Sequence, residues 1–174
     1  MYNNISSLTL TGCSFFSNTA DSGGGMYSYG GSLTLENCTF ISNSAYNGNC
    51  GGMYNSNCSP TLTGCTFRSN STDYYGGGMF NYGSSNPTLT DTTVCGNTPD
   101  QIDGDWTDNG GNTVADICPE CPDINGDGYV DVTDLLAVID VWGCTDCSDV
   151  DVNQDGIVNR DDLVIVIASW GACP

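Results

Sequence analysis

The chain has 174 residues, 21 of them acidic and only two basic, Arg68 and Arg160, and it contains no histidine. A formal net charge of -19 argues against binding to nucleic acid or to anionic membrane surfaces, because those partners need basic side chains to neutralise their phosphates. The longest apolar run, residues 163–168, is far too short to span a bilayer.

The acidic residues are distributed unevenly along the chain. Only four acidic residues precede residue 98, so the chain has a compositional boundary there.

Eleven cysteines without histidine or lysine favour disulfides in an oxidising compartment over zinc or catalytic-thiol sites. We therefore expect an extracellular or cell-surface protein.

The first two residues repeat a phrase found inside the chain. Met1 and Tyr2 correspond to Met26 and Tyr27, and the same pair recurs as Met53–Tyr54 and Met79–Phe80. We interpret Met1 as an internal methionine of a repeat. This hypothesis places further repeats, and the signal peptide of an exported protein, upstream of Met1.

Residues 1–97 consist of repeats with a period of 25 to 27 residues. The segments LTLTGCSFFSN, LTLENCTFISN, PTLTGCTFRSN and PTLTDTTVCGN begin at Leu8, Leu33, Pro60 and Pro87. Each alternates apolar and polar residues with period two, and Gly, Asn and Ser separate the segments. Such a period without helical spacing predicts a parallel β-helix of about four coils.

The alternation also assigns residues to the interior and to the turns. Three columns should point inward, and one column of asparagines should mark a turn, where asparagine tolerates left-handed backbone and can bond along the stack. The inward columns are Leu10, Leu35, Leu62 and Leu89; Cys13, Cys38 and Cys65 with Thr92; and Phe15, Phe40 and Phe67 with Val94. The turn column is Asn18, Asn43, Asn70 and Asn97.

The GG-Met element (Gly24–Met26, Gly51–Met53, Gly77–Met79) and the F-x-x-N element (Phe15–Asn18, Phe40–Asn43, Phe67–Asn70) resemble the repeats of bacterial polymorphic outer-membrane proteins and related solenoids of pectate-lyase type. The resemblance implies a mainly β fold, a right-handed parallel β-helix, in a surface adhesin or a carbohydrate-active protein. Residues 98–117 change character and are predicted to form a terminal cap and linker.

Two candidate sites lie on the repeats. Asp21 and Asp73 follow their column cysteines by eight residues, two coils apart, a separation compatible with a pair of hydrolase carboxylates or with ordinary surface turns. Tyr27, Tyr54 and Phe80 should form an outward aromatic stripe. The stripe either packs against sugar rings or is a ladder that only supports the coils.

Residues 118–174 contain two copies of a second motif. DINGDGYVDVTD begins at Asp123 and DVNQDGIVNRDD at Asp151, and the 28-residue offset continues through the apolar residues that follow. Each copy matches an EF-hand calcium loop, in which oxygens at alternate positions surround a hard cation. The predicted ligands of the first ion are Asp123, Asn125, Asp127, the Tyr129 carbonyl, Asp131 and Asp134. Those of the second are Asp151, Asn153, Asp155, the Ile157 carbonyl, Asn159 and Asp162.

The composition of the loops predicts two Ca²⁺ ions of unequal affinity. The first loop offers four carboxylates and the second three, so the first should bind more tightly. Gly128 and Gly156 should supply the sharp turns.

Both loops close with Asp, and each is followed by an apolar helix but preceded by none. In these features residues 121–173 closely resemble the type I dockerin module, which implies calcium-dependent folding and docking onto cohesin-type partners. In that family recognition centres on the two residues before the closing Asp, here Val132–Thr133 and Arg160–Asp161, which differ between the copies.

The small module needs a shared core and covalent support. The helical spacing predicts that core from Leu135, Val138, Ile139 and Trp142 and from Leu163, Val166, Ile167 and Trp170. The eight cysteines outside the inward column are expected to pair as Cys121–Cys144, Cys147–Cys173, Cys50–Cys58 and Cys95–Cys118.

Three functions are compatible with this sequence. The leading hypothesis is a calcium-dependent docking or anchoring module attached to a β-helix that binds polysaccharide or acts as an adhesin. The alternative is part of a polysaccharide-degrading enzyme with its active site upstream or at Asp21 and Asp73. A purely structural surface filament is the third.

Overall fold

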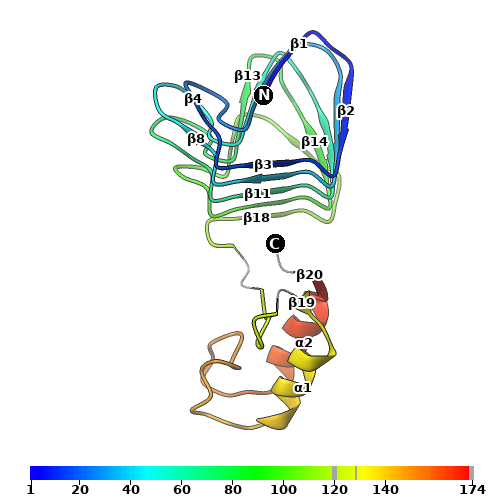
Figure 1. The fold of residues 1–174 in the computed structure, drawn as a ribbon, viewed down its shortest axis with the longest axis vertical. Coiled ribbons are helices and arrows are strands. Elements are labelled where there is room, and N and C mark those ends of the chain that lie inside the picture. Colours follow the sequence, from blue (N-terminus) through cyan, green and yellow to red (C-terminus); the bar gives the residue numbers. More distant parts are fainter. Residues whose placement is uncertain (119–120, 128, 173–174) are drawn as a thin grey trace. The chain divides into compact units, whose positions relative to one another are not determined.

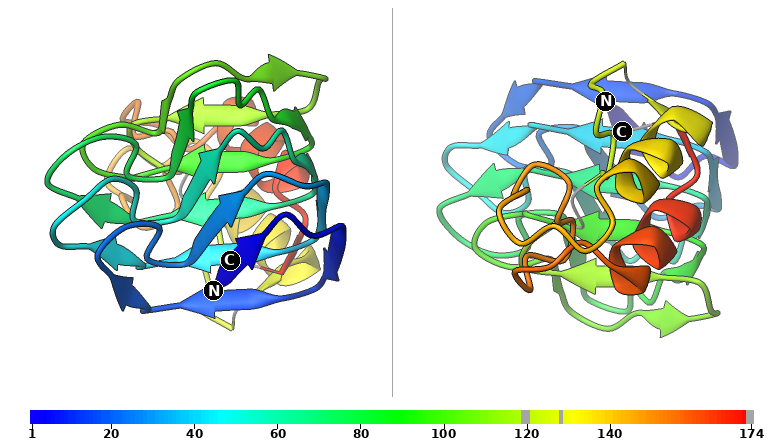
Figure 2. Two further views of the ribbon diagram at one scale, coloured as in Figure 1. Left: turned by 90° about the horizontal axis from the view of Figure 1, so that it is seen from above. Right: turned by 90° about the horizontal axis from the view of Figure 1, so that it is seen from below.

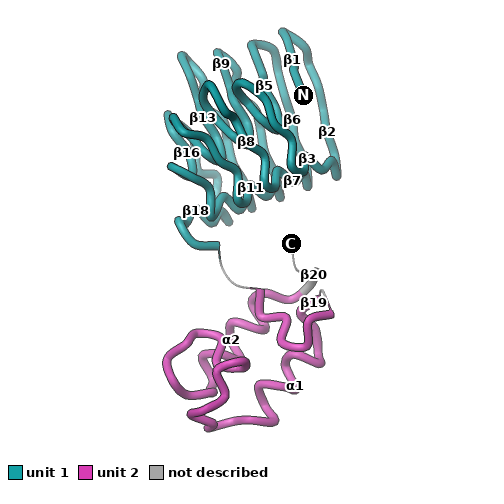
Figure 3. Tube along the Cα trace, turned by 60° about the vertical axis from the view of Figure 1, so that its left-hand side comes forward, with its two compact units in different colours: residues 1–118 teal, residues 119–174 magenta. Residues whose placement is uncertain are grey.

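The computed structural model describes residues 1–118, 121–127 and 129–172. The chain divides into two compact units, residues 1–118 and residues 119–174, which are coloured separately in Figure 3. The first unit is built of short strands and the second of two helices with long loops (Figure 1).

The first unit is a solenoid of parallel strands, in which successive coils add strands to three five-stranded sheets and to one three-stranded sheet. The first sheet has the order β1 (Tyr2–Asn4), β5 (Met26–Tyr29), β9 (Met53–Ser56), β13 (Met79–Tyr82), β16 (Ile102–Asp103). The second has β2 (Leu8–Thr11), β6 (Leu33–Glu36), β10 (Thr61–Thr63), β14 (Thr88–Thr90), β17 (Thr107–Asp108). The third has β3 (Ser14–Phe16), β7 (Thr39–Ile41), β11 (Thr66–Arg68), β15 (Thr93–Cys95), β18 (Thr113–Ala115), and a narrow fourth has β4 (Thr19–Ala20), β8 (Ser44–Ala45), β12 (Ser71–Thr72).

The repeats stack in register, so the predicted solenoid of about four coils is confirmed. Leu10, Leu35, Leu62 and Leu89 are Cα partners in successive strands of the second sheet. In the left view of Figure 2 the coils follow one another from the blue first coil at the bottom to the green last coil at the top. Variation in the period is absorbed in the connections outside the strands, as between Tyr46 and Gly51.

The interior consists of the predicted columns. Leu35, Leu62 and Leu89 are fully buried, as are Phe40 and Phe67, whose rings stack with their centroids 4.5 Å apart. A column that the alternation only implied, Met26, Met53 and Met79, is also fully buried. In the first coil Leu10, Cys13 and Phe15 are half-buried and pack against this core.

The asparagine column forms a continuous hydrogen-bonded ladder. Asn18, Asn43 and Asn70 each donate from Nδ2 to Oδ1 of the next asparagine at 2.9 Å, and the chain of bonds ends when Asn97 Nδ2 donates to Gln101 Oε1. The left-handed backbone, however, belongs to the preceding residue, as at Ser42 (φ 55°), and not to the asparagine. The amide therefore stays free to point inward, where it satisfies backbone groups that the turn would otherwise leave buried and unpaired.

Residues 98–117, predicted as cap and linker, contribute strands β16, β17 and β18 to the first three sheets. Trp106 packs half-buried against the core cluster. This last turn is shorter than the others; it carries Asp103, Asp105, Asp108 and Asp116, and it also exposes Val114 and Ile117.

The second unit contains α1 (Val132–Asp140) and α2 (Arg160–Ala168), with a small antiparallel pair of strands, β19 (Tyr129–Val130) and β20 (Gly171–Ala172). The two helices lie side by side in the right view of Figure 2. Their buried core is Val130, Val138, Val158 and Val166, with Leu135 and Leu163 packed partly against it.

The sequence predicts a core of four apolar residues from each helix, and this prediction is wrong for the last two residues of each set. Ile139, Trp142, Ile167 and Trp170 are each about half exposed, between 49% and 54%. Each helix ends after nine residues, before its tryptophan, so Trp142 and Trp170 are not held on the apolar stripe. The result is two similar outward apolar surfaces instead of one larger core.

One of the four predicted disulfides is confirmed, Cys95–Cys118. Cys144 bonds to Cys147, so the predicted pairs Cys121–Cys144 and Cys147–Cys173 are wrong; Cys173 itself lies outside the described residues.

The predicted Cys50–Cys58 pair is also wrong, because both thiols are free and buried. Strand β9 separates them, and four extended residues span roughly 13 Å, well beyond disulfide reach.

Candidate functional site

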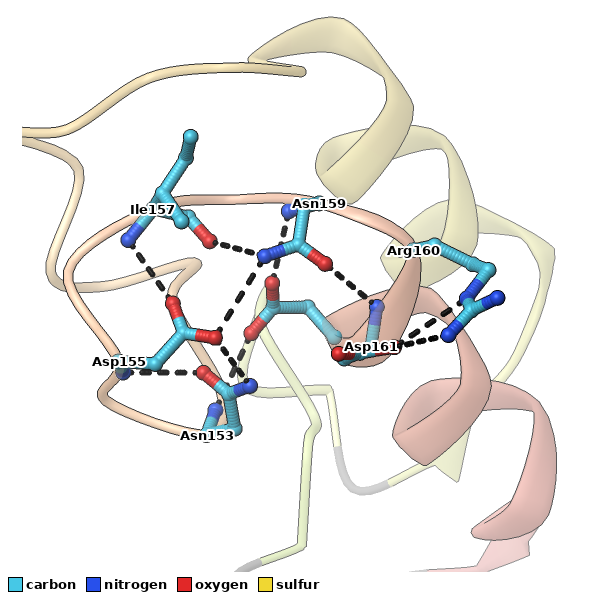
Figure 4. A network of polar contacts seen from close by, with 7 residues as sticks. Asn153, Asp155, Ile157, Asn159, Arg160 and Asp161 are labelled. Carbon is cyan, nitrogen blue, oxygen red and sulfur yellow. Dashed lines mark hydrogen bonds and ion pairs between the residues drawn. The ribbon is translucent and has the colours of Figure 1, made fainter.

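The two acidic loops of the second unit have the same internal architecture. Asp127 N–H donates to Asn125 Oδ1 and Tyr129 N–H donates to Asp127 Oδ1. In the second loop Asp155 N–H donates to Asn153 Oδ1 and Ile157 N–H to Asp155 Oδ1 (Figure 4). Equivalent hydrogen bonds at a 28-residue offset show that the duplicated sequence folds as a duplicated loop.

The closing aspartates are the most constrained residues of the loops. Asp134 is fully buried and accepts hydrogen bonds from the backbone N–H groups of Ile124, Asn125 and Asp131. Asp162 is also fully buried and accepts from Asn153 N–H and Asn159 N–H at 3.1 and 2.8 Å. A buried carboxylate of this kind ties the start of its loop to the end.

The same aspartates also start the helices, a role that the sequence analysis missed. Asp131 and Asn159 are the N-caps of α1 and α2, and Asp134 and Asp162 complete the reciprocal capping boxes. Hydrogen bonds from the hydroxyl and N–H of Thr133 lower the pKa of Asp131. The signal was present in the spacing D-x-x-D and N-x-x-D, which is that of a capping box as well as of a calcium loop.

Positive charge is scarce around these carboxylates. Residues 119–174 contain 12 acidic residues and a single basic one, Arg160. Its guanidinium donates to exposed Asp161 at 3.0 Å, as Figure 4 shows, and this is the only ion pair within the described residues. The buried charges of Asp134 and Asp162 are thus compensated by N–H dipoles and by no side-chain cation.

The donor set fits a hard divalent cation. Within the described residues no three acidic or thiol side chains form a metal-binding cluster, and the amide groups of Asn125 and Asn153 bond to the carboxylates of Asp127 and Asp155. The loops nevertheless present carboxylate, amide and carbonyl oxygens at alternate positions, which are the ligands that Ca²⁺ takes. Gly156 has a left-handed φ of 91°, while the turn predicted at Gly128 lies outside the described residues.

The two candidate carboxylates of the solenoid follow strands of the fourth sheet. Asp21 and Asp73 follow β4 and β12, and β8 separates these strands with Tyr46 after it. Hydrogen bonding to Asp21 raises the pKa of Tyr46. The register places Asp21 and Asp73 two coils apart, and their catalytic role stays a prediction.

The aromatic stripe is a stacked ladder. The rings of Tyr27 and Tyr54 lie 4.5 Å apart and nearly parallel, and Phe80 is only 9% exposed beside Tyr75. Because the inner rings cover each other's faces, the stripe offers mainly ring edges and hydroxyls, and this arrangement favours the supporting role. Burial raises the pKa of Tyr54 to about 12.

A hollow of about 480 Å³ lies at the first-coil end of this ladder. Tyr2, Asp21, Ser22 and Tyr27 line it, with Met1, Ala20 and Gly23. It brings together one predicted carboxylate and one predicted aromatic residue.

No helix in the described residues has the length and hydropathy that a bilayer crossing requires.

Comparison with known families agrees with this division. Residues 1–116 match the model of the right handed beta helix region, and residues 121–169 match the type I dockerin domain. No curated protein and no solved structure matches the chain. Type I dockerins bind calcium and cohesins and occur in extracellular proteins, so the combination fits a docking module on a carbohydrate-related protein. Its first 116 residues place the chain in the right-handed β-helix family, and a type I dockerin domain follows them.

Proposed function

We propose that residues 118–174 form a docking module that binds two Ca²⁺ ions and attaches the β-helix of residues 1–97 to a cohesin-type partner outside the cell. The observation that carries this proposal is the pair of buried closing aspartates, Asp134 and Asp162, each tying a loop of oxygen donors to a helix start. Calcium supplies the positive charge that the side chains do not. Its loss should loosen both loops and both helix N-termini together.

The docking surface that the structure supports best lies on α1. Thr133, Leu136, Ala137, Ile139 and Asp140 line a hollow of about 380 Å³ on this helix. Leu136 and Ile139, which are 55% and 49% exposed, make the lining of this hollow partly apolar.

Docking is tested with recombinant type I cohesin domains and the full chain, by calorimetry in calcium and in EGTA. We expect binding in calcium only, and a loss of about a hundredfold in Leu136→Glu, because a charge would be buried at the contact. The duplication supplies a matched control, Val164→Glu, at the equivalent position on α2. Equal binding in EGTA, or no binding to any cohesin, would contradict the docking role.

For the solenoid we propose polysaccharide binding, as a second function supported by the hollow at Tyr2, Asp21 and Tyr27. Residues 1–118 carry nine acidic residues and one basic residue, so an uncharged glycan suits this surface better than a polyuronate.

Affinity electrophoresis tests this assignment. Hydroxyethyl cellulose in the gel should retard the full chain, polygalacturonate should not, and Tyr27→Ala should reduce the retardation about threefold, because its ring lines the hollow. Unchanged migration of Tyr27→Ala would remove the hollow as a glycan site.

A further inference from the structure

The outer face of the second sheet carries a regular array of threonines. Its five strands pair in register, so residues at matching positions form columns that run from coil to coil. One column is Thr9, Thr34, Thr61, Thr88 and Thr107, and a parallel column is Thr11, Glu36, Thr63 and Thr90. The alternate residues are the leucines of the core.

These threonine hydroxyls are available to an outside partner. Thr90 accepts a bond from Asn109, and Thr107 donates to Asn86, but the other six threonine hydroxyls of the array have no hydrogen-bond partner in the described part of the chain. The next sheet carries a single such column, and its parallel column holds Phe16, Ile41, Arg68, Cys95 and Ala115. Thr9, Thr11, Thr61 and Thr63 are exposed, and Glu36 is the only charged residue in the two columns.

The array has a fixed lattice. Neighbouring coils are separated by about 4.8 Å, the distance set by amide N–H···O=C hydrogen bonds between strands. Along each strand the two threonines lie about 6.7 Å apart, on the same side of the pleat. Threonine is β-branched and stiff at χ1, so its hydroxyl and methyl groups hold these positions at little entropic cost.

A solid whose own chains are stacked by amide hydrogen bonds repeats at nearly the same distance, because the same bond sets its spacing. We propose that this face binds the ordered surface of crystalline chitin, an uncharged polymer of N-acetylated amino sugars stacked in this way. Each threonine of a column then meets one acetamido group, and the two lattices keep the same register over the five strands of the first column. The inference rests on the proposed polysaccharide-binding role of the solenoid and names a different face and a more specific ligand.

Binding is tested by depletion of the full chain onto α-chitin powder, with microcrystalline cellulose and soluble chito-oligosaccharides as further probes. We expect at least tenfold weaker binding to chitin in a double variant carrying Thr61→Lys and Thr63→Lys. Thr66→Lys, in the same coil but on the neighbouring sheet, is the control and should bind like the unaltered chain. Glu36→Thr, which completes the second column, should bind several-fold more tightly.

Other outcomes overturn the inference in distinguishable ways. Chitin binding that Tyr27→Ala removes and the threonine double variant retains would move the glycan to the hollow and leave the polysaccharide role intact. In the Tyr27→Ala background, equal depletion by cellulose, or binding to soluble oligosaccharides as strong as to the solid, would show that the amide lattice is not recognised. Failure of chitin to deplete the chain would remove this inference, while the retardation in hydroxyethyl cellulose would still decide the polysaccharide role of the hollow. Each variant is first shown by urea unfolding to keep the solenoid's stability.

Discussion

In the Asp134→Asn variant we expect the second unit to be unfolded at a calcium concentration at which the second unit of the unaltered chain is folded. The carboxylate of Asp134 accepts three backbone N–H bonds without exposure to water, and an amide in its place would direct donors at donors. This mismatch costs about 3 kcal/mol before any calcium ligand is counted. A unit of this size has little stability to spare.

The measurement is circular dichroism at 222 nm during calcium titration of the full chain. In the described residues the only helices are α1 and α2, so this signal reports the second unit. Asp161→Asn is the control, because Asp161 is exposed and pairs only with exposed Arg160, and its effect should stay within about 0.5 kcal/mol. A normal calcium titration of Asp134→Asn would show that the closing aspartate is dispensable.

The Asn70→Ala variant should have the largest effect on the solenoid. Asn70 donates to the Phe40 carbonyl and to Asn97, and it accepts from the side chain and backbone of Asn43, all without contact with solvent. Removing it leaves the buried Asn43 N–H without a partner and takes one bond each from Asn43 Nδ2, Asn97 Oδ1 and the Phe40 carbonyl, at a cost of about 4 kcal/mol. The midpoint of thermal unfolding should fall by roughly 15 °C.

Asn18→Ala is the graded comparison, because Asn18 lies at the exposed end of the same ladder and its side chain bonds only to Asn43 Oδ1. Its cost should be about 1 kcal/mol. Equal destabilisation by the two variants, followed as loss of the β signal in urea, would show that the ladder does not act through burial of its amides.

Much of the solenoid could be predicted because its physics is repetitive. Period-two alternation fixes which side chains point inward, and repetition in four coils fixes the register, so the leucine, phenylalanine and asparagine columns are as expected. The role of Gln101 at the end of the asparagine ladder was not predicted, because Gln101 does not belong to a repeat. Its role depends on the short last turn, which no periodicity marks.

The second unit was predictable in its loops and less so in its packing. The repeated motif D-x-N-x-D-G predicts two equivalent loops, and their hydrogen bonds are equivalent. The length of α1 decides whether Trp142 faces the core, and the motif does not encode that length. Disulfide pairing failed for a related reason. Cys144 and Cys147 meet within one local turn, while the expected partners require knowledge of how the segments pack.

The same backbone hydrogen bonds join each coil to the next. This repetition limits how the sequence of such a chain can change during evolution. A single inserted residue in a strand would turn its inward side chains outward and break the register of every column. Duplication or loss of one whole coil, about 26 residues, leaves each asparagine between two others and each phenylalanine on another ring. Gene length in this family should therefore drift in steps of one coil, with the Gln101 terminus carried along unchanged.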